Sequence, residues 1–154
     1  MKKHIEAVDL QLIHWFQKWY TPLARGSLFV VYFWFGILKV LGLSPATPLA
    51  EALTLRTVGA DWFDPLYLTL AIIECIIGLL FLFPKLTRLA IAVMVGHMVL
   101  VCSPLVLLAD MVWVYPFVPS LEGQYIIKNV VLIAVAISIA STVRPLKKVP
   151  LKRA

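Results

Sequence analysis

Four long apolar runs restrict what this chain can fold into. They cover residues 23–43, 66–83, 86–108 and 124–142. Each run is close to the roughly 20 residues that a helix needs to cross about 30 Å of hydrocarbon. Because a bilayer offers the backbone no water, such runs are expected to be helical, and the polar alternation of a transmembrane barrel is absent. The sequence therefore predicts an all-α integral membrane four-helix bundle.

The composition supports this class. Of 154 residues, 62% are hydrophobic and 14% are charged, whereas a soluble domain has about 45–50% apolar and about 25% charged residues. A single domain over residues 1–154 is expected at this length. Cys75 and Cys102 fall inside the apolar runs and are interpreted as small buried hydrophobes. Polar residues scattered through the first 20 positions argue against a cleavable signal peptide.

The segment before the first run is amphipathic. Over residues 4–20, apolar side chains recur every three or four positions, and polar ones occupy the other face. We predict a helix that lies in the membrane interface. A partner-binding helix, or an extension of the first span into the cytoplasm, fits the same pattern.

Short signals predict local features between and within the spans. Pro84-Lys85 predicts a tight turn between the second and third spans, and Ser103-Pro104 predicts a kink in the third. The stretch Leu49–Thr57 is patterned as a short helix in the outer loop.

Basic residues gather on one side of the predicted spans. These are Lys2, Lys3, Lys18, Arg25, Lys85, Arg88, Arg144, Lys147, Lys148, Lys152 and Arg153, the last five in a basic tail over residues 143–154. The positive-inside rule then places both termini in the cytoplasm. Because the basic residues flank apolar spans, we expect the lipid bilayer, and not nucleic acid, as the partner of this charge. Trp62, Trp113, Tyr115 and Phe117 are expected at the opposite interface.

Apart from the basic residues near the cytoplasmic ends of the runs, Lys39, Glu74, His97 and Lys128 are the acidic, basic or histidine residues within the apolar runs. A charge at the bilayer centre costs about 2.5–3.5 kcal/mol on insertion scales, so such residues are usually paired or functional. Helical rise places both lysines about 6 Å, and Glu74 about 12 Å, below the outer boundary. We therefore expect Glu74 to lie beneath the two lysines in one polar cluster.

The candidate ligand-binding site adds the polar neighbours of Lys128, which are Tyr125 and Asn129, and takes His97 as a secondary candidate. Other interpretations stay open: both lysines could snorkel to the interface, and Glu74 could be a structural strut. His97 alone in an apolar span is more often an interhelical contact than a ligand.

Several kinds of chemistry have no signature in this chain. A zinc or di-iron site needs three or four ligands at helical spacing, and the spans offer one Glu and one His. There is no Ser–His–Asp arrangement, phosphate-binding glycine loop or dinucleotide motif. We predict no metal, and no cofactor motif is evident, although a quinone would suit the polar cluster. Whether the protein is an enzyme is left open.

Three stretches carry a resemblance to a known family: Phe33–Leu43 (FWFGILKVLGL), Ile72–Pro84 (IIECIIGLLFLFP) and Glu122–Ala134 (EGQYIIKNVVLIA). In order and spacing the chain resembles the DoxX-like family of small four-helix membrane proteins, near the branch of the bacterial reactive-chlorine-resistance membrane protein. The resemblance places the family's polar positions on Lys39, Glu74, Gly123 and Lys128. It implies a bacterial inner-membrane protein linked to redox or oxidative-stress systems.

Three functions remain for the later sections. The first is a membrane component of a quinone-linked redox or stress-defence system, in which an outer-leaflet polar pocket holds a quinone headgroup or a small redox ligand. The second is a non-enzymatic assembly subunit or anchor. In it the buried charges set the register of the helices, and the basic tail from Arg144 to Arg153 binds anionic lipid or a partner, such as a protein of a redox complex. The third, a small-solute transporter, would need an oligomer, because four helices are few for alternating access and no inverted repeat is visible.

Overall fold

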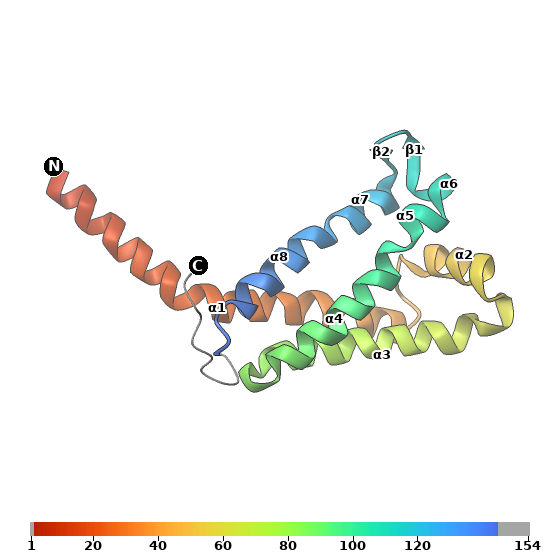
Figure 1. Cartoon of the computed structure of the whole chain (residues 1–154), viewed down its shortest axis with the longest axis horizontal. Helices are drawn as coiled ribbons and strands as arrows, with labels where there is room; N and C mark the ends of the chain where they lie inside the picture. The colour runs from red at the N-terminus through yellow and green to blue at the C-terminus, as the bar shows by residue number, and fades with distance from the viewer. Residues whose placement is uncertain (1, 145–154) are drawn as a thin grey trace, which may run out of the picture.

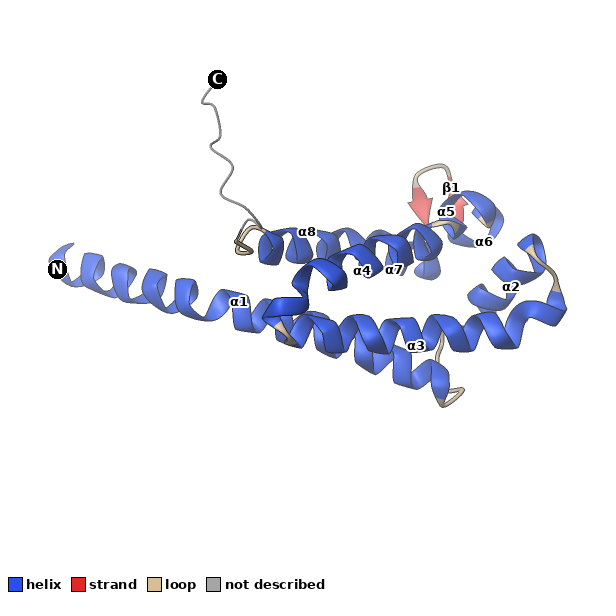
Figure 2. Cartoon of the chain, turned by 60° about the horizontal axis from the view of Figure 1, so that its bottom comes forward, coloured by secondary structure: helices blue, strands red, loops and turns tan. Residues whose placement is uncertain are grey.

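A computed structural model describes residues 2–144, and these are mostly helical. Four segments are long and apolar enough to cross a membrane: His4–Val40, Ala60–Leu82, Pro84–Leu107 and Leu121–Ala140. They run alternately up and down beside one another (Figures 1 and 2). The predicted all-α helical bundle is confirmed, while its insertion into a membrane stays a prediction.

The long segments are built from shorter elements. In chain order these are α1 (Lys2–Val40), α2 (Thr47–Thr57), η1 (Ala60–Trp62), α3 (Phe63–Leu82), η2 (Pro84–Leu86), α4 (Thr87–Cys102), α5 (Pro104–Leu107), α6 (Ala109–Val112), β1 (Trp113–Tyr115), β2 (Val118–Pro119), α7 (Leu121–Ile127) and α8 (Asn129–Ala140). The predicted kink is confirmed, since α4 ends just before Ser103-Pro104. The predicted tight turn at Pro84-Lys85 is the short helix η2.

The helix predicted over residues 4–20 is present and is continuous with the first span, while its placement in the membrane interface stays a prediction. α1 is one continuous helix that runs through Pro22 into the first span. No glycine interrupts the helix before residue 26. A proline bends a helix without ending it when the turns on both sides of it stay helical. Figure 1 shows the N-terminal half of α1 leaving the bundle at an angle to the rest. The continuity is compatible with the alternative of an extension of the first span, and the angle is compatible with the predicted interfacial placement.

The outer loops contain one predicted and one unpredicted element. The short helix expected near Leu49–Thr57 is confirmed as α2. Between α6 and α7 the chain instead forms a small antiparallel hairpin of β1 and β2. Pro116 and Phe117 make its turn, and Phe117 has a φ of 63°. That left-handed conformation is unusual for a bulky residue, and glycine or asparagine, the usual signals for such a turn, are absent from it.

Helices α1 and α3 pack at very close range because each contributes a glycine. A Cβ atom at Gly36 would lie 2.9 Å from the Ala71 carbonyl oxygen, and one at Gly78 would lie 2.9 Å from the Phe33 backbone nitrogen. Small residues let helices approach closely in this way. The core beside this contact is apolar and includes Leu28, Tyr32, Ile77, Phe81, Ala90, Met94 and Ile139, all buried.

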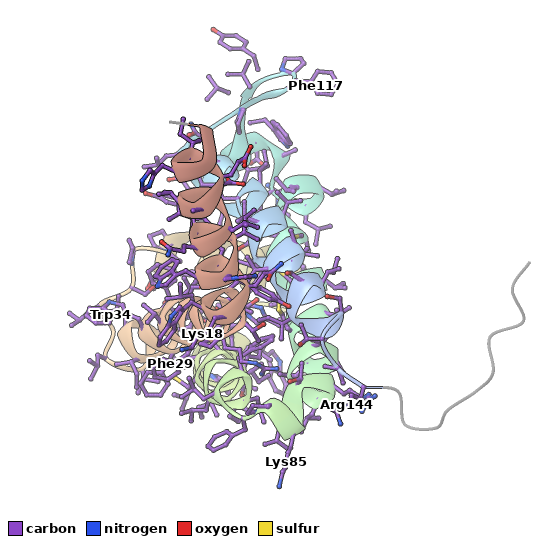
Figure 3. The ribbon with its side chains drawn as sticks, turned by 90° about the vertical axis from the view of Figure 1, so that its left-hand side faces the viewer. Lys18, Phe29, Trp34, Lys85, Phe117 and Arg144 are labelled. Atoms are coloured by element: carbon purple, nitrogen blue, oxygen red, sulfur yellow. The ribbon has the colours of Figure 1, made fainter. Side chains whose placement is uncertain are left out.

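The two ends of the bundle carry different side chains. Figure 3 shows Lys85 and Arg144 at one end and Phe117 at the other. At the basic end Arg88 donates a hydrogen bond of 2.7 Å to the Arg144 carbonyl oxygen, which joins the start of α4 to the end of α8. From position 145 onward the predicted basic tail lies outside the described residues.

Candidate functional site

The buried face of α1 carries polar residues at regular intervals. Arg25, Tyr32 and Lys39 follow one another at seven-residue spacing, or about two helical turns, so they share one face. Arg25 and Tyr32 are buried, and the Lys39 side chain is only 8% exposed. This face presents a cation near each end of the bundle and a phenol between them.

Glu74 lies in the middle of the buried face of α3 and joins three helices. Its Oε2 is 2.6 Å from Nζ of Lys39 on α1, and its Oε1 is 3.1 Å from Nε2 of His97 on α4. The side chains of Glu74 and His97 are 8% and 4% exposed. Lys39, Glu74 and His97 therefore form one buried polar group, which we call the Lys–Glu–His triad.

Two polar atoms beside the triad have no partner among the described residues. They are Nδ1 of His97 and the hydroxyl of Tyr32, both buried. The two rings meet edge to face, with centroids 5.5 Å apart and an interplanar angle of 68°. Buried polar groups are nearly always hydrogen-bonded, so unpartnered ones call for an explanation. Both atoms can therefore take a further hydrogen bond beside the triad.

Lys128 does not join this cluster, which corrects the expectation that Glu74 lies beneath two lysines. Lys128 is exposed, and its Nζ lies 5.1 Å from the ring centre of Tyr125, which is also exposed. Asn129 is half-buried and makes no hydrogen bond to Glu74. The reason is helical geometry: Lys128 follows buried Ile126 by two residues, which is about 200° around the helix.

The triad can hold and move a proton. A carboxylate between a lysine and an imidazole is neutralised by the lysine and can exchange a proton with the ring. Because His97 uses Nε2 toward Glu74, its other ring nitrogen offers a second position for that proton. Metal binding has no comparable basis: within residues 2–144, no three His, Cys, Asp or Glu side chains gather at one point.

A second polar contact lies at the basic end of the bundle. The Arg25 guanidinium donates to the Phe81 carbonyl oxygen at 3.0 Å and to the Thr87 hydroxyl at 2.7 Å. Thr87 in turn donates to the Pro84 carbonyl oxygen at 2.8 Å. Arg25 thereby fastens α1 to the turn between α3 and α4.

Sequence reasoning missed the polar contacts of Arg25 and the buried Tyr32 hydroxyl beside the triad. Arg25 was interpreted only as a flanking positive charge, and Tyr32 was not singled out. A signal in the sequence could have identified both: Arg25, Tyr32 and Lys39 follow one another at seven-residue intervals, and the sequence already indicated that Lys39 is buried. Gly123, a polar-position match in the family resemblance, instead packs against the Val112 carbonyl oxygen, where any Cβ would clash.

Comparison with protein-family models, with curated proteins and with solved structures finds no match to this chain. The class that the fold itself defines is an α-helical bundle with four candidate membrane spans and a buried ionisable triad.

Proposed function

We propose that this chain is a DoxX-like protein of the bacterial inner membrane that serves a quinone-linked redox or oxidative-stress-defence system. In this role the Lys–Glu–His triad handles a proton that accompanies electron transfer to a quinone. The single observation that carries the proposal is the burial of Glu74 between Lys39 and His97, 2.6 Å from one and 3.1 Å from the other.

The physical support is the cost of such a group in an apolar bundle. A buried ion pair contributes little net stability, because desolvation offsets its attraction, and apolar side chains of similar size often do as well. Stability alone therefore does not explain why three helices share a buried polar group with two further unpartnered polar atoms beside it. Ionisable residues in spans that face the bundle interior commonly mark proton or ligand pathways.

The proposed mechanism assigns each residue a distinct part. Reduction of a quinone takes up two electrons, supplied here by a redox partner protein, and two protons. Lys39 would stabilise negative charge on a reduced headgroup bound beside it. Glu74 and His97 would deliver one of the two protons, and water at the outer interface would supply the second. The Tyr32 ring would lie beside His97 at this site. Lys128 and Tyr125 are exposed and enter only as an outer contact surface.

One observation favours the second candidate, an assembly subunit or anchor. Residues 4–20 of α1 are exposed throughout and protrude from the bundle (Figure 1). Their apolar side chains include Trp15, Phe16 and Trp19, which would suit a lipid surface or the helix of a partner. In that case the triad is a strut that sets the register of α1, α3 and α4.

The experiment is quinone quantification by mass spectrometry in protein purified with its native lipids. We expect quinone in the wild type above its level in the surrounding membrane, and loss of that excess in Glu74→Gln. Arg56→Gln serves as a matched control, since it removes an exposed ion pair to Asp110 at 3.1 Å, outside the triad. Equal quinone in wild type and bulk membrane would refute the redox proposal and favour the assembly role.

A further inference from the structure

A groove at the basic end of the bundle stands apart from the triad. Its volume is about 380 Å³, and it lies between α1 and the end of α3; its lining residues are Thr21, Pro22, Arg25, Gly26, Leu82 and Pro84. We propose that this groove binds the phosphate group of an anionic phospholipid, with the Arg25 guanidinium as the recognition group.

Arg25 is a buried cation without a carboxylate partner. The residue is 8% exposed, and its two hydrogen bonds go to neutral oxygens, those of Phe81 and Thr87. No Asp or Glu among the described residues lies within ion-pair distance of it, and positions 1 and 145–154 contain neither residue type. Because buried charges are normally paired, Arg25 calls for an anion from outside the chain.

The protein supplies only part of the missing negative charge. The Phe81 carbonyl lies in the last turn of α3, where the helix dipole amounts to about half a charge. The guanidinium has five N–H donors and uses two of them here, so three remain. A phosphodiester has a full negative charge and the oxygen geometry that a guanidinium fork matches.

The position of the groove favours a lipid over free phosphate. η2 joins two candidate spans, so in the membrane placement proposed above this turn lies at the headgroup level. Pro22, Leu82 and Pro84 make the walls apolar, as a glycerol and acyl region requires. Lys18 lies three residues before Thr21 on the same helix face and adds positive charge toward the cytoplasm. The inference rests on membrane placement and is independent of the redox role.

The test uses the full-length protein in nanodiscs of equal phosphatidylglycerol and phosphatidylcholine, with retained lipid identified by native mass spectrometry. We expect the wild type to retain phosphatidylglycerol about fivefold over phosphatidylcholine, on the scale of one basic residue at an anionic surface. Arg25→Met should abolish the preference. Stable incorporation into the nanodisc checks the membrane placement separately.

Because Arg25→Met also breaks the hydrogen bonds of Arg25 to Phe81 and Thr87, a second pair of variants tests the groove with these bonds intact. A Cβ at Gly26 meets no heavy atom within 4 Å, so Gly26→Leu fills the groove and leaves Arg25 in place. Gly96→Leu is the matched control, because Gly96 is equally open and lies on α4 away from the groove. We expect Gly26→Leu to lose the lipid preference and Gly96→Leu to keep it.

Two results would overturn the inference. One is a Gly26→Leu protein that retains phosphatidylglycerol as the wild type does. The other is inorganic phosphate, added to delipidated protein in detergent, that raises the melting temperature as much as phosphatidylglycerol does, since the ligand would then be a soluble anion.

Discussion

At the scale of single residues, the triad is asymmetric. Lys39 is one residue from the end of α1, where its cation also meets the negative end of the helix dipole, whereas Glu74 is deep within α3. If Glu74 is removed, the flexible side chain of Lys39 can extend and place its ammonium group at the interface. Glu74 has no such route, so the two partners should differ in what their loss costs.

We therefore predict that Lys39→Met destabilises the protein more than Glu74→Gln does. Removing Lys39 leaves a buried carboxylate without its cation, a loss of about 3–5 kcal/mol. Gln at position 74 keeps a hydrogen-bonding group toward His97, so its cost should be smaller. Thermal unfolding in detergent measures the stability of both variants. A larger loss of stability in Glu74→Gln would contradict the prediction and show that the lysine cannot reach the interface.

At the scale of elements, the close approach of α1 to α3 positions the triad. Lys39 and Glu74 can meet because Gly36, one turn before Lys39, and Gly78, one turn after Glu74, bring the helix backbones together. The atoms that block a Cβ at Gly78 are mostly backbone atoms of Phe33 and Phe29, which cannot rotate away. The packing and the polar contact are thus one arrangement.

Gly78→Ala is predicted to lower the stability by about 1–3 kcal/mol, the usual cost of overpacking. It should also lengthen the contact between Lys39 and Glu74 and so reduce quinone retention. Gly96→Ala adds the same methyl group where no heavy atom lies within 4 Å, and it should be neutral or slightly stabilising. Equal melting temperatures for the two variants would contradict the close contact.

Much of the element order could be predicted from the sequence because span length and apolarity decide it. The kink at Ser103-Pro104 and the short helix α2 followed from local signals in the same way. The continuity of the N-terminal segment with the first span could not be predicted. Pro22 is compatible with either a kink or a break in the helix, and the local sequence does not distinguish the two. The β1–β2 hairpin was missed because Phe117 occupies a position where glycine or asparagine is the usual signal.

The candidate site could be predicted only in part. Burial cost alone identified Lys39, Glu74 and His97 as unusual, but span depth does not define direction around a helix. Lys128 has the right depth and lies on the wrong face, since the contacts that orient α7 and α8 come from Ile126, Ala136 and Ile139. The pairing of Arg25 with the α3–α4 turn depends on tertiary contacts across more than 50 residues.

At the scale of the whole molecule, the bundle is electrically polarised. Lys85, Arg88 and Arg144 lie at the end where α4 begins and α8 ends, while the hairpin with Phe117 lies at the other (Figure 3). The positive-inside rule predicts that the first end faces the cytoplasm. In that orientation, we predict that the triad lies in the outer half of the bundle and the Arg25 groove at the inner leaflet.

Single-cysteine labelling tests this orientation. In a background of Cys75→Ala and Cys102→Ala, we expect Phe117→Cys to react with a membrane-impermeant maleimide in intact spheroplasts. Lys85→Cys should react only after the membrane is opened. Labelling of both positions before lysis, or the reverse order, would refute the proposed topology.

The most direct test of the central claim compares stability with function in Lys39→Met/Glu74→Gln. This double variant removes both charges, so it leaves no uncompensated ion and should unfold within about 1 kcal/mol of the wild type. We predict that it nevertheless loses the enrichment of quinone over the surrounding membrane. Wild-type quinone retention at wild-type stability would contradict the account and show that the triad serves only to hold the helices together.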